Sequence, residues 1–200
     1  VFQLKSWCDY YGYNRPKLIN MYGITETTVH VTYKSIEDVV LGKSSCIGKI
    51  IPDLKAYVLN SDLIPLPIGA IGELYIGGPG LARGYLNRPA LTAERFINNP
   101  FQTHDDRKQR KNARIYKTGD LVRWLPNGDL EYIGRNDFQV KVRGYRIELE
   151  EIESVLSSYE KVKQSVVLAK EHINKDGVYT DNKYLVGYYV AEIKLDEDSI

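Results

Sequence analysis

The sequence predicts an α+β protein in which a β-rich subdomain is followed by a small, incomplete α+β subdomain. Two observations give this prediction. Residues 47–133 contain short apolar runs separated by Gly and Pro, a pattern typical of short strands joined by turns. After Gly134 the pattern changes to a hairpin, a helix and further strands, so we place a boundary at Asp137. Residues 194–200 are polar and offer no closing element, and we expect the second subdomain to be truncated.

The N-terminal residues predict a helix and a strand. Leu4–Cys8 predicts part of an amphipathic helix, and Pro16–Gly23 predicts a buried strand that ends at a glycine turn. A buried strand needs neighbours, and few precede this one. We therefore expect the residues before about Val31 to be poorly packed, exchanged with a second copy or covered by a partner, with Leu18 and Ile19 not fully buried.

The middle of the chain predicts short strands, one helix and one loop. Pro126–Asp129 predicts a hairpin turn, because Asn-Gly tolerates positive φ. Thr92–Phe96 predicts a short helix, and the polar, charge-rich stretch Gln102–Asn112 predicts a mobile surface loop. The strand candidates are Lys55–Leu59, Gly72–Gly77, Leu121–Trp124 and Leu130–Ile133.

The C-terminal part predicts the order strand, strand, helix, strand, strand. Phe138–Val142 and Tyr145–Ile147 can pair as a hairpin, and Glu148–Ser158 predicts a helix whose acidic first turn suits the helix dipole. Two strands are predicted after it, at Ser165–Ala169 and Tyr184–Ala191. The apolar residues expected on one face of the helix are Leu149, Ile152, Val155 and Leu156.

Composition excludes several classes of function. The chain has 27 Lys and Arg against 26 Asp and Glu, and this balance argues against a nucleic-acid partner, which a basic surface would attract. No apolar run approaches the roughly 20 residues of a membrane span, and the first residues show no secretory signal, so no membrane partner is expected. Cys8 and Cys46 lack metal-ligand spacing, which predicts reduced thiols in a cytoplasmic protein.

Two early segments contain residues suited to chemistry, and each has a structural alternative. In Asn20–Thr28 a strand end is followed by Gly, a hydroxyl and a carboxylate, which can bind a phosphate and Mg²⁺, or can form a turn and a capped helix. Gly72–Tyr85 is glycine-rich, but Gly80 and Gly84 flank no helical pattern. We therefore interpret Gly72–Tyr85 as tight turns without phosphate contact.

Two later segments are equally ambiguous by themselves. In Tyr116–Leu121 the carboxylate of Asp120 can accept both hydroxyls of a ribose, or can cap a turn. In Gly134–Glu148 charged residues alternate with apolar ones, which a solvated hairpin with cross-strand ion pairs would also explain.

Together, the order and spacing of the four segments resemble the adenylation domains of nonribosomal peptide synthetases, within the adenylate-forming superfamily. The resemblance runs from about Leu18 to Ala191 and includes Asn87–Phe96. It implies three parts: residues 1–30 as the tail of a large α/β core, 31–136 as a β-rich subdomain of distorted-barrel type, and 137–200 as the start of a mobile C-terminal subdomain. The family's upstream Ser/Thr/Gly-rich phosphate loop, the Asp that binds the substrate's amino group and the late catalytic lysine have no counterpart, which predicts a C-terminal fragment that is inactive alone.

The resemblance also implies an activity. The family uses ATP and an amino acid to make an aminoacyl-adenylate and pyrophosphate, and passes the acyl group to the phosphopantetheine of a peptidyl carrier domain. The expected setting is secondary metabolite biosynthesis, with ATP and Mg²⁺ required and a condensation domain as neighbour. Which amino acid is activated is left open.

Residue roles follow by resemblance for the nucleotide. Thr25 is expected to bind the α-phosphate, and Glu26 to ligate Mg²⁺. Tyr22 is expected to flank the adenine, and Asp120 to hold both ribose hydroxyls. Arg135 is expected to contact the ribose or a phosphate. Tyr132 is expected to pack beside the nucleotide.

Further roles concern the substrate and the second half-reaction. Asp137 matches the family's hinge, and Gly144 is expected to leave room for the pantetheine arm. Met21, Val29 and His30 fall where the family lines its amino-acid pocket, and His30 is expected to act in specificity rather than as a base.

Two alternatives remain. One is an acyl-CoA or aryl-acid ligase of the same superfamily, which shares the Thr-Glu and Thr-Gly-Asp elements but often has Pro near Leu149; Arg143–Leu149 favours the peptide-synthetase branch. The other is a noncatalytic folded fragment that serves as a docking surface.

Overall fold

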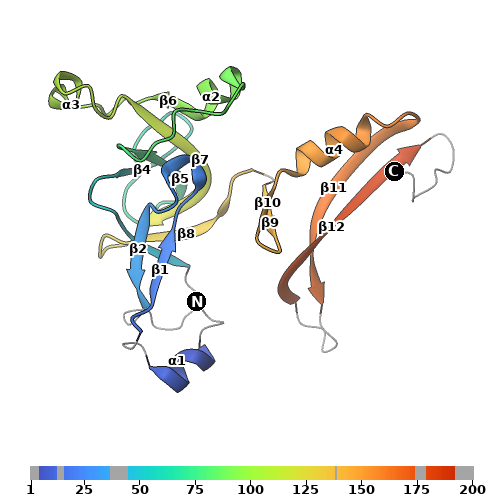
Figure 1. Ribbon diagram of the computed structural model, residues 1–200, viewed down its shortest axis with the longest axis horizontal. Coiled ribbons are helices and arrows are strands. Elements are labelled where there is room, and N and C mark those ends of the chain that lie inside the picture. Colours follow the sequence, from blue (N-terminus) through green and yellow to red (C-terminus); the bar gives the residue numbers. More distant parts are fainter. Residues whose placement is uncertain (1–4, 13–15, 37–44, 138, 174–178, 192–200) are drawn as a thin grey trace. The chain divides into compact units, whose positions relative to one another are not determined.

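The computed structural model of the chain describes residues 5–12, 16–36, 45–137, 139–173 and 179–191. It forms two compact units, Val1–Asn136 and Asp137–Ile200, called unit 1 and unit 2 below (Figure 1). The division of the chain at residues 30 and 136 into domains of a larger protein stays a prediction. In this structure the strand within residues 1–30 pairs with a strand of residues 31–136 in one unit.

Unit 1 consists mainly of strands, with short helices between them. All the pairings in its sheet are antiparallel, which suits a chain whose strands are joined by short turns. Its helices and strands are α1 (Lys5–Tyr11), β1 (Ile19–Tyr22), a 3₁₀ helix (Thr25–Thr27), β2 (Thr32–Ser35), β3 (Cys46–Ile50), β4 (Lys55–Leu59), β5 (Gly72–Gly77), α2 (Pro89–Arg95), β6 (Phe96–Asn98), α3 (His104–Lys108), β7 (Arg114–Trp124) and β8 (Leu130–Arg135).

The sheet of unit 1 is a single 8-stranded sheet in the order β1-β2-β3-β8-β7-β5-β4, with β6 also paired to β7. The predicted β-rich, α+β architecture is therefore confirmed. Among the described strands the hydrogen-bonded path does not return from β4 to β1, so the sheet is open and not a closed barrel. β7 pairs with β5, β6 and β8, which makes it the centre of the unit.

The core of unit 1 lies on both faces of β5. Leu74 and Ile76 belong to the larger cluster, together with Val122 of β7 and Leu130 of β8. Tyr75 points to the opposite face and packs with Leu59 and Ile115, because neighbouring side chains of a strand alternate between faces. A strand buried on both faces gives β7 a fixed partner, and β7 carries Tyr116 and Asp120 of the candidate site.

Several predicted elements of unit 1 need correction. The strand predicted at 121–124 begins at Arg114, and the helix predicted at Thr92–Phe96 is α2, which ends before Phe96 enters β6. The loop predicted at Gln102–Asn112 contains α3, whose capping box joins Thr103 and Asp106. The pattern that marks this helix is Thr103 followed three positions later by Asp106. The helix was not predicted because its 5 residues are too few to show a helical pattern of apolar residues.

The strand at the N-terminus is present, but it is not buried as predicted. Ile19 is 44% exposed and Leu18 is half-buried, because β1 lies at the end of the sheet and pairs only with β2. Met21 of β1 lies opposite Tyr33 of β2, and both side chains are exposed. Leu18 and Ile19 are therefore not fully buried, as expected, but Cys8, Glu26 and Thr27 are buried, so the expectation of poor packing does not hold for all residues before Val31.

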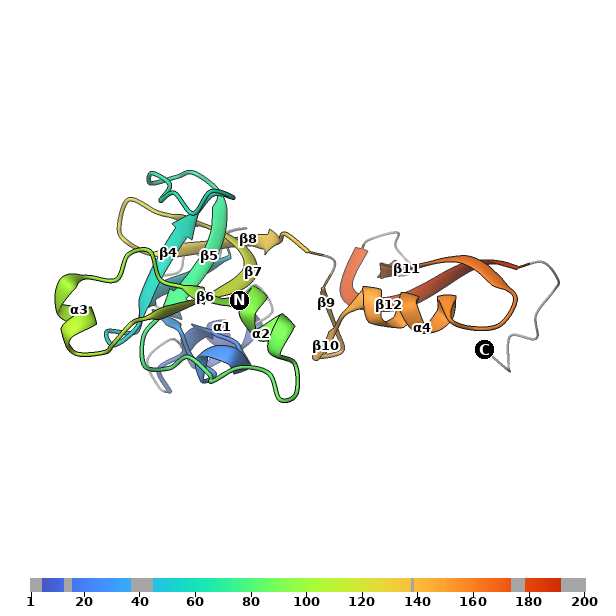
Figure 2. The same ribbon diagram turned by 90° about the horizontal axis from the view of Figure 1, so that it is seen from above.

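Unit 2 confirms the predicted order of strand, strand, helix, strand, strand. Its α4 lies against the β11–β12 hairpin, where Val167 is buried (Figure 2). The predicted apolar face of α4 is only partly correct: Leu149 is buried, but Val155 is 68% exposed and Ile152 is also exposed. The elements are β9 (Val140–Val142), β10 (Tyr145–Ile147), α4 (Leu149–Ser157), β11 (Val162–Ile173) and β12 (Tyr179–Ala191). Among the helices that the structure describes, none has both the length and the apolar character needed to cross a membrane.

Candidate functional site

The turn after β1 directs one carboxylate into unit 1. Gly23 is required here, because a Cβ at this position would lie 1.8 Å from the backbone oxygen of Val29. The 3₁₀ helix that follows ends in two residues with positive φ, Thr28 at 59° and Val29 at 70°, and the latter is unusual for a β-branched residue. As a result Glu26 is only 6% exposed, while Thr25 is exposed.

Glu26 contacts a segment far away in the sequence. The hydroxyl of Tyr85 donates to Glu26 Oε1 at 2.8 Å and lies 3.0 Å from the hydroxyl of Tyr116 in β7. The backbone amide of Ala82 donates to the Glu26 carbonyl at 2.9 Å, and Thr28 Oγ1 donates to the Gly80 carbonyl at 2.7 Å. Burial raises the pKa of Tyr85 well above its ordinary value, and its hydrogen bonds to Tyr116 and Glu26 raise it further, so Tyr85 stays neutral.

Asp120 lies on β7 at a local distortion of the strand. Gly119 has φ 75°, the pairing with β8 shifts register just after Asp120, and the Asp120 amide donates to Thr118 Oγ1 at 3.0 Å. Arg135 lies opposite Asp120 in register and donates from one nitrogen to Asp120 Oδ1 at 3.0 Å and to the Thr118 carbonyl at 3.0 Å. The side chain of Asp120 thereby points at the end of β1.

The second oxygen of the Asp120 carboxylate is also engaged. The hydroxyl of Tyr22, at the end of β1, donates a short hydrogen bond to Asp120 Oδ2. Burial raises the pKa of Tyr22 well above its ordinary value, and the charge of Asp120 adds to this, so the phenol keeps its proton and remains a donor. Asp120 is only 4% exposed, and each of its two oxygens already accepts a hydrogen bond.

Glu73 of β5 stabilises the same distortion of β7 by accepting two hydrogen bonds. It is 8% exposed and accepts the Gly119 amide at 3.0 Å on one oxygen and the Asn136 side-chain amide at 3.1 Å on the other. The Asn136 backbone amide in turn donates to the Gly119 carbonyl at 2.9 Å. Glu73 therefore links the turn that orients Asp120 to the residue just before Asp137.

The structure brings most of the predicted nucleotide residues together. Tyr22, Asp120 and Arg135 form one hydrogen-bonded group, and the ring of Tyr132 lies 6.4 Å from the ring of Tyr22. Glu26 is joined to the same strand, since Tyr85 connects it to Tyr116 of β7.

The predicted substrate-pocket residues lie on the surface beside this group. Met21, Val29 and His30 are all exposed, and the His30 amide donates to the Thr28 carbonyl at 2.9 Å.

Three residues of the site were missed by the sequence: Tyr85, Tyr116 and Glu73. Tyr85 and Glu73 lie in the glycine-rich segment Gly72–Tyr85, which was interpreted as tight turns, and Tyr116 opens the segment Tyr116–Leu121, in which only Asp120 was given a role. No local pattern marks them, because their partners are distant in sequence.

The donors at Glu26 fit magnesium. The described part of the chain holds no group of three or more His, Cys, Asp or Glu side chains that could enclose a metal ion. Mg²⁺ usually keeps several waters and is held by one or two carboxylates together with substrate phosphates. The single buried carboxylate of Glu26 suits that mode of binding.

Unit 2 contains the remaining predicted residues. Asp137 Oδ1 accepts the Gln139 amide at 3.2 Å. In the turn between β9 and β10, Arg143 and Gly144 both have positive φ, 52° and 86°, as a tight hairpin turn requires. A Cβ on Gly144 would meet no atom within 4 Å, so open space adjoins the turn.

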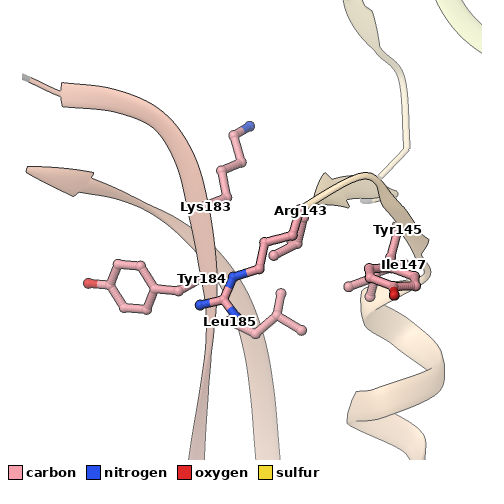
Figure 3. Close-up of a pocket in the computed structure, with 7 residues that line it drawn as sticks. Arg143, Tyr145, Ile147, Lys183, Tyr184 and Leu185 are labelled. Carbon is pink, nitrogen blue, oxygen red and sulfur yellow. The ribbon is translucent and has the colours of Figure 1, made fainter.

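A cavity of about 380 Å³ lies between this hairpin and β12 (Figure 3). The side chain of Arg143 extends from the turn across the cavity toward Leu185, and Lys183 lies on the neighbouring part of β12 (Figure 3). The cavity therefore combines two cationic side chains with the apolar and aromatic groups of Val142, Tyr145, Ile147, Tyr184 and Leu185.

Comparison with known sequences gives consistent matches. Residues 3–86 match the family model described as AMP-binding enzyme. The chain is 50% identical over 183 residues to N-(5-amino-5-carboxypentanoyl)-L-cysteinyl-D-valine synthase of Amycolatopsis lactamdurans, covering 92% of the chain and 5% of that protein. It is 49% identical over 171 residues to the dimodular nonribosomal peptide synthase of Bacillus subtilis, covering 84% of the chain and 7% of that protein. The chain thus spans only a small part of the curated relatives that it matches.

Solved structures give the same result for the fold. PA1221, an NRPS protein containing adenylation and PCP domains, matches 94% of the chain with a TM-score of 0.73 and 28% identity, over 36% of that protein's chain. An artificially fused adenylation-PCP di-domain NRPS from Klebsiella oxytoca matches 94% of the chain with a TM-score of 0.68 and 27% identity, over 33% of its chain.

Proposed function

We propose that the chain is part of a nonribosomal peptide synthetase adenylation domain, because residues 3–86 match the AMP-binding enzyme family model and the relatives and solved structures described above match most of the chain. The complete domain would join an amino acid to the AMP part of ATP with release of pyrophosphate, and then transfer the aminoacyl group to the phosphopantetheine of a carrier domain. This chain supplies part of the nucleotide site and the start of the mobile subdomain, and alone it is inactive.

In this proposal the group around Asp120 binds the nucleoside. The carboxylate of Asp120 accepts the ribose hydroxyls, and Arg135 holds that carboxylate in place and contacts the ribose or a phosphate. Tyr22 and Tyr132 offer aromatic rings beside the adenine. The hydrogen bond from Tyr22 to Asp120 Oδ2 stands where a ribose hydroxyl would donate, so nucleotide binding has to replace it.

The turn after β1 binds the phosphates. The exposed hydroxyl of Thr25 donates to the α-phosphate, and Glu26 would hold Mg²⁺. When bound, the ion neutralises phosphate charge and thereby assists the attack of the carboxylate on the α-phosphorus. The chain's own contribution is to position these groups before the substrates react.

The remaining roles concern the substrate and the transfer step. Met21, Val29 and His30 would line one side of the amino-acid pocket. Asp137 would be the hinge of the mobile subdomain, and the turn at Gly144 would admit the pantetheine arm. The positive charges of Arg143 and Lys183 in the neighbouring cavity suit a ligand with a phosphate.

The wider setting is part of the proposal. A peptidyl carrier domain is the partner of the second step, and a condensation domain is the expected neighbour in the complete protein. Cys8 and Cys46 are both free thiols, which supports the predicted cytoplasmic location.

One observation carries the proposal: two buried carboxylates predicted for one nucleotide, Glu26 and Asp120, are both tied by hydrogen bonds to β7 or its partners within one unit. The test is amino-acid-dependent exchange of labelled pyrophosphate into ATP by the complete protein that contains this chain. We expect exchange with an amino acid, its loss in Glu26→Gln, and none from the 200-residue chain alone. Exchange that depends on fatty or aryl acids would favour the ligase alternative, and full exchange by Glu26→Gln would contradict the assigned role of that carboxylate.

A further inference from the structure

The segment from Gly80 to Tyr85 has no role in the function proposed above, yet it is bound to the Glu26 turn at several points. We propose that Tyr85 is the positioning residue for Glu26, and that this segment orients the carboxylate for the cation that accompanies the nucleotide. The inference rests on the proposed role of Glu26 and adds to it a residue that the sequence pattern assigned to turns only.

The direction of the hydrogen bonds supports this role. An ionised carboxylate only accepts, so the Tyr85 hydroxyl is the donor to Glu26 Oε1 at 2.8 Å. Each phenol has one proton to donate, so the contact of 3.0 Å between Tyr85 and Tyr116 must be donated by Tyr116. The protons thus run in one direction, from Tyr116 through Tyr85 to Glu26. Tyr116 is buried in β7, so its position is fixed. The two hydrogen bonds hold the Glu26 carboxylate relative to it.

The segment from Gly80 to Tyr85 is itself held by hydrogen bonds on two sides. Its backbone is bound to the Glu26 turn from one side, by the Ala82 amide on the Glu26 carbonyl at 2.9 Å and by Thr28 Oγ1 on the Gly80 carbonyl at 2.7 Å. From the other side, Arg114 of β7 donates to the carbonyls of Arg83 at 3.0 Å and Ala82 at 3.1 Å.

The close packing between this segment and the Glu26 turn supports the same role. A Cβ on Gly80 would lie 3.2 Å from the backbone oxygen of Thr27, which shows how closely the two backbones approach. The segment therefore fixes both the backbone and the side chain of Glu26.

The turn that carries Glu26 has little support from its own backbone and caps. The 3₁₀ helix is a single short turn, no side-chain cap supports its start, and its end has left-handed backbone geometry. Such a turn cannot hold a buried carboxylate in one rotamer by its own backbone. Groups that orient a metal ligand typically change metal affinity by about 10- to 100-fold when they are removed. Tyr85, which donates to Glu26 Oε1, is in position to have this effect.

The test measures metal binding directly, in the complete protein, with Mn²⁺ as the probe. Electron paramagnetic resonance gives the affinity for Mn²⁺ in the presence of a non-hydrolysable ATP analogue, and calorimetry gives the affinity for the analogue without metal. For Tyr85→Phe we expect Mn²⁺ affinity to fall about tenfold, because a hydrogen bond to a charged group is lost, while analogue affinity without metal stays within about twofold. Tyr57→Phe is the matched control, since Tyr57 stacks on Phe101 away from this segment, and it should change neither affinity.

Three variants make the outcomes distinguishable. Tyr116→Phe removes the donor to Tyr85, and we expect a smaller fall of about threefold. If Tyr85→Phe melts well below the wild type, the result for Tyr116→Phe tests the inference instead. Unchanged Mn²⁺ affinity in both tyrosine variants, with affinity lost in Glu26→Gln, would overturn the inference and leave the proposed function intact. Unchanged affinity in Glu26→Gln would instead overturn the assigned role of Glu26 on which the inference rests.

Discussion

The two units present their candidate residues in opposite ways. In unit 1 the acidic residues Glu26, Glu73 and Asp120 are buried, and each accepts hydrogen bonds from other elements. In unit 2 the turn with Arg143 and Gly144 is exposed, and its cavity is open to ligands. Buried charges are stable only when they are paired, so unit 1 has its polar geometry built before any substrate arrives. Exposed charges are solvated in the free protein, so they remain available to bind a ligand or a partner protein.

Under the proposed function, this difference assigns the two half-reactions to different units. Positioning a nucleotide requires groups that do not reorganise, and a sheet with a core on both faces of β5 supplies them. Binding and releasing a carrier requires a surface that is complete only in the complex. We therefore expect mutations in unit 1 to affect both stability and the first step, and mutations at the exposed turn of unit 2 to affect only the second.

The largest effect is expected for Asp120→Ala. Pyrophosphate exchange by the complete protein should fall at least about 100-fold, because hydrogen bonds to a charged group contribute about 1.5–3 kcal/mol each. Stability should fall by about 3 kcal/mol, since Arg135 loses its carboxylate partner in a buried site. Exchange assays and thermal denaturation measure the two effects.

Asp129→Asn is the matched control for Asp120→Ala. Asp129 is buried and is paired to Lys34 at 2.9 Å, but it has no assigned role in the site. It should lower stability and leave exchange by the folded protein unchanged. Equal losses of exchange in both variants would contradict a specific role for Asp120 in nucleotide binding.

The next effect concerns the cavity of unit 2. Reversing both charges, Arg143→Glu with Lys183→Glu, should slow aminoacyl transfer to the carrier about tenfold, since exposed ion pairs contribute up to about 1 kcal/mol each. Pyrophosphate exchange should stay within about twofold. The control is Arg107→Glu with Lys108→Glu in the last turn of α3, which reverses two exposed charges of unit 1. Equal slowing by the control would assign the effect to net charge and not to the cavity.

A smaller effect of opposite sign is expected for Tyr22→Phe. The ring stays, but the hydroxyl that occupies Asp120 Oδ2 is gone, so a ribose no longer has to displace it. The affinity for ATP without metal should rise about threefold, within the range of one net hydrogen bond. Calorimetry on the complete protein measures it. A clear loss of affinity would mean that the phenol binds the nucleotide and does not compete with it.

The smallest effect is a dependence on pH. Burial, together with the nearby charge of Glu73, raises the pKa of Tyr75 from 10.0 to about 12. The unfolded chain therefore loses this proton first, and the free energy of unfolding should fall as pH rises from about 10 to about 12. Urea denaturation at pH 9 and pH 11 should show a smaller fall for Tyr75→Phe than for the wild type. An identical fall would assign the alkaline loss to other groups.

Local sequence determined the elements that have a local cause. The turn at Asn127 and Gly128 was predicted because Asn-Gly tolerates positive φ, and Gly128 has φ 79°. Lys55–Leu59 and Gly72–Gly77 were predicted with the bounds that the structure gives. Elements that depend on pairing partners were predicted less well, and β7 extends seven residues before the predicted start because β5 and β6 pair with that part of it.

The sequence by itself also determined which residue types are present for a nucleotide: a hydroxyl and a carboxylate after β1, and an aspartate after Thr-Gly in β7. Only the tertiary structure decided what holds them. Tyr22 lies 98 positions from Asp120, and Tyr85 lies 59 positions from Glu26. No periodicity or spacing within a single segment can encode such pairs. They follow from the register of antiparallel strands and the packing of loops upon them, which the whole sheet fixes at once.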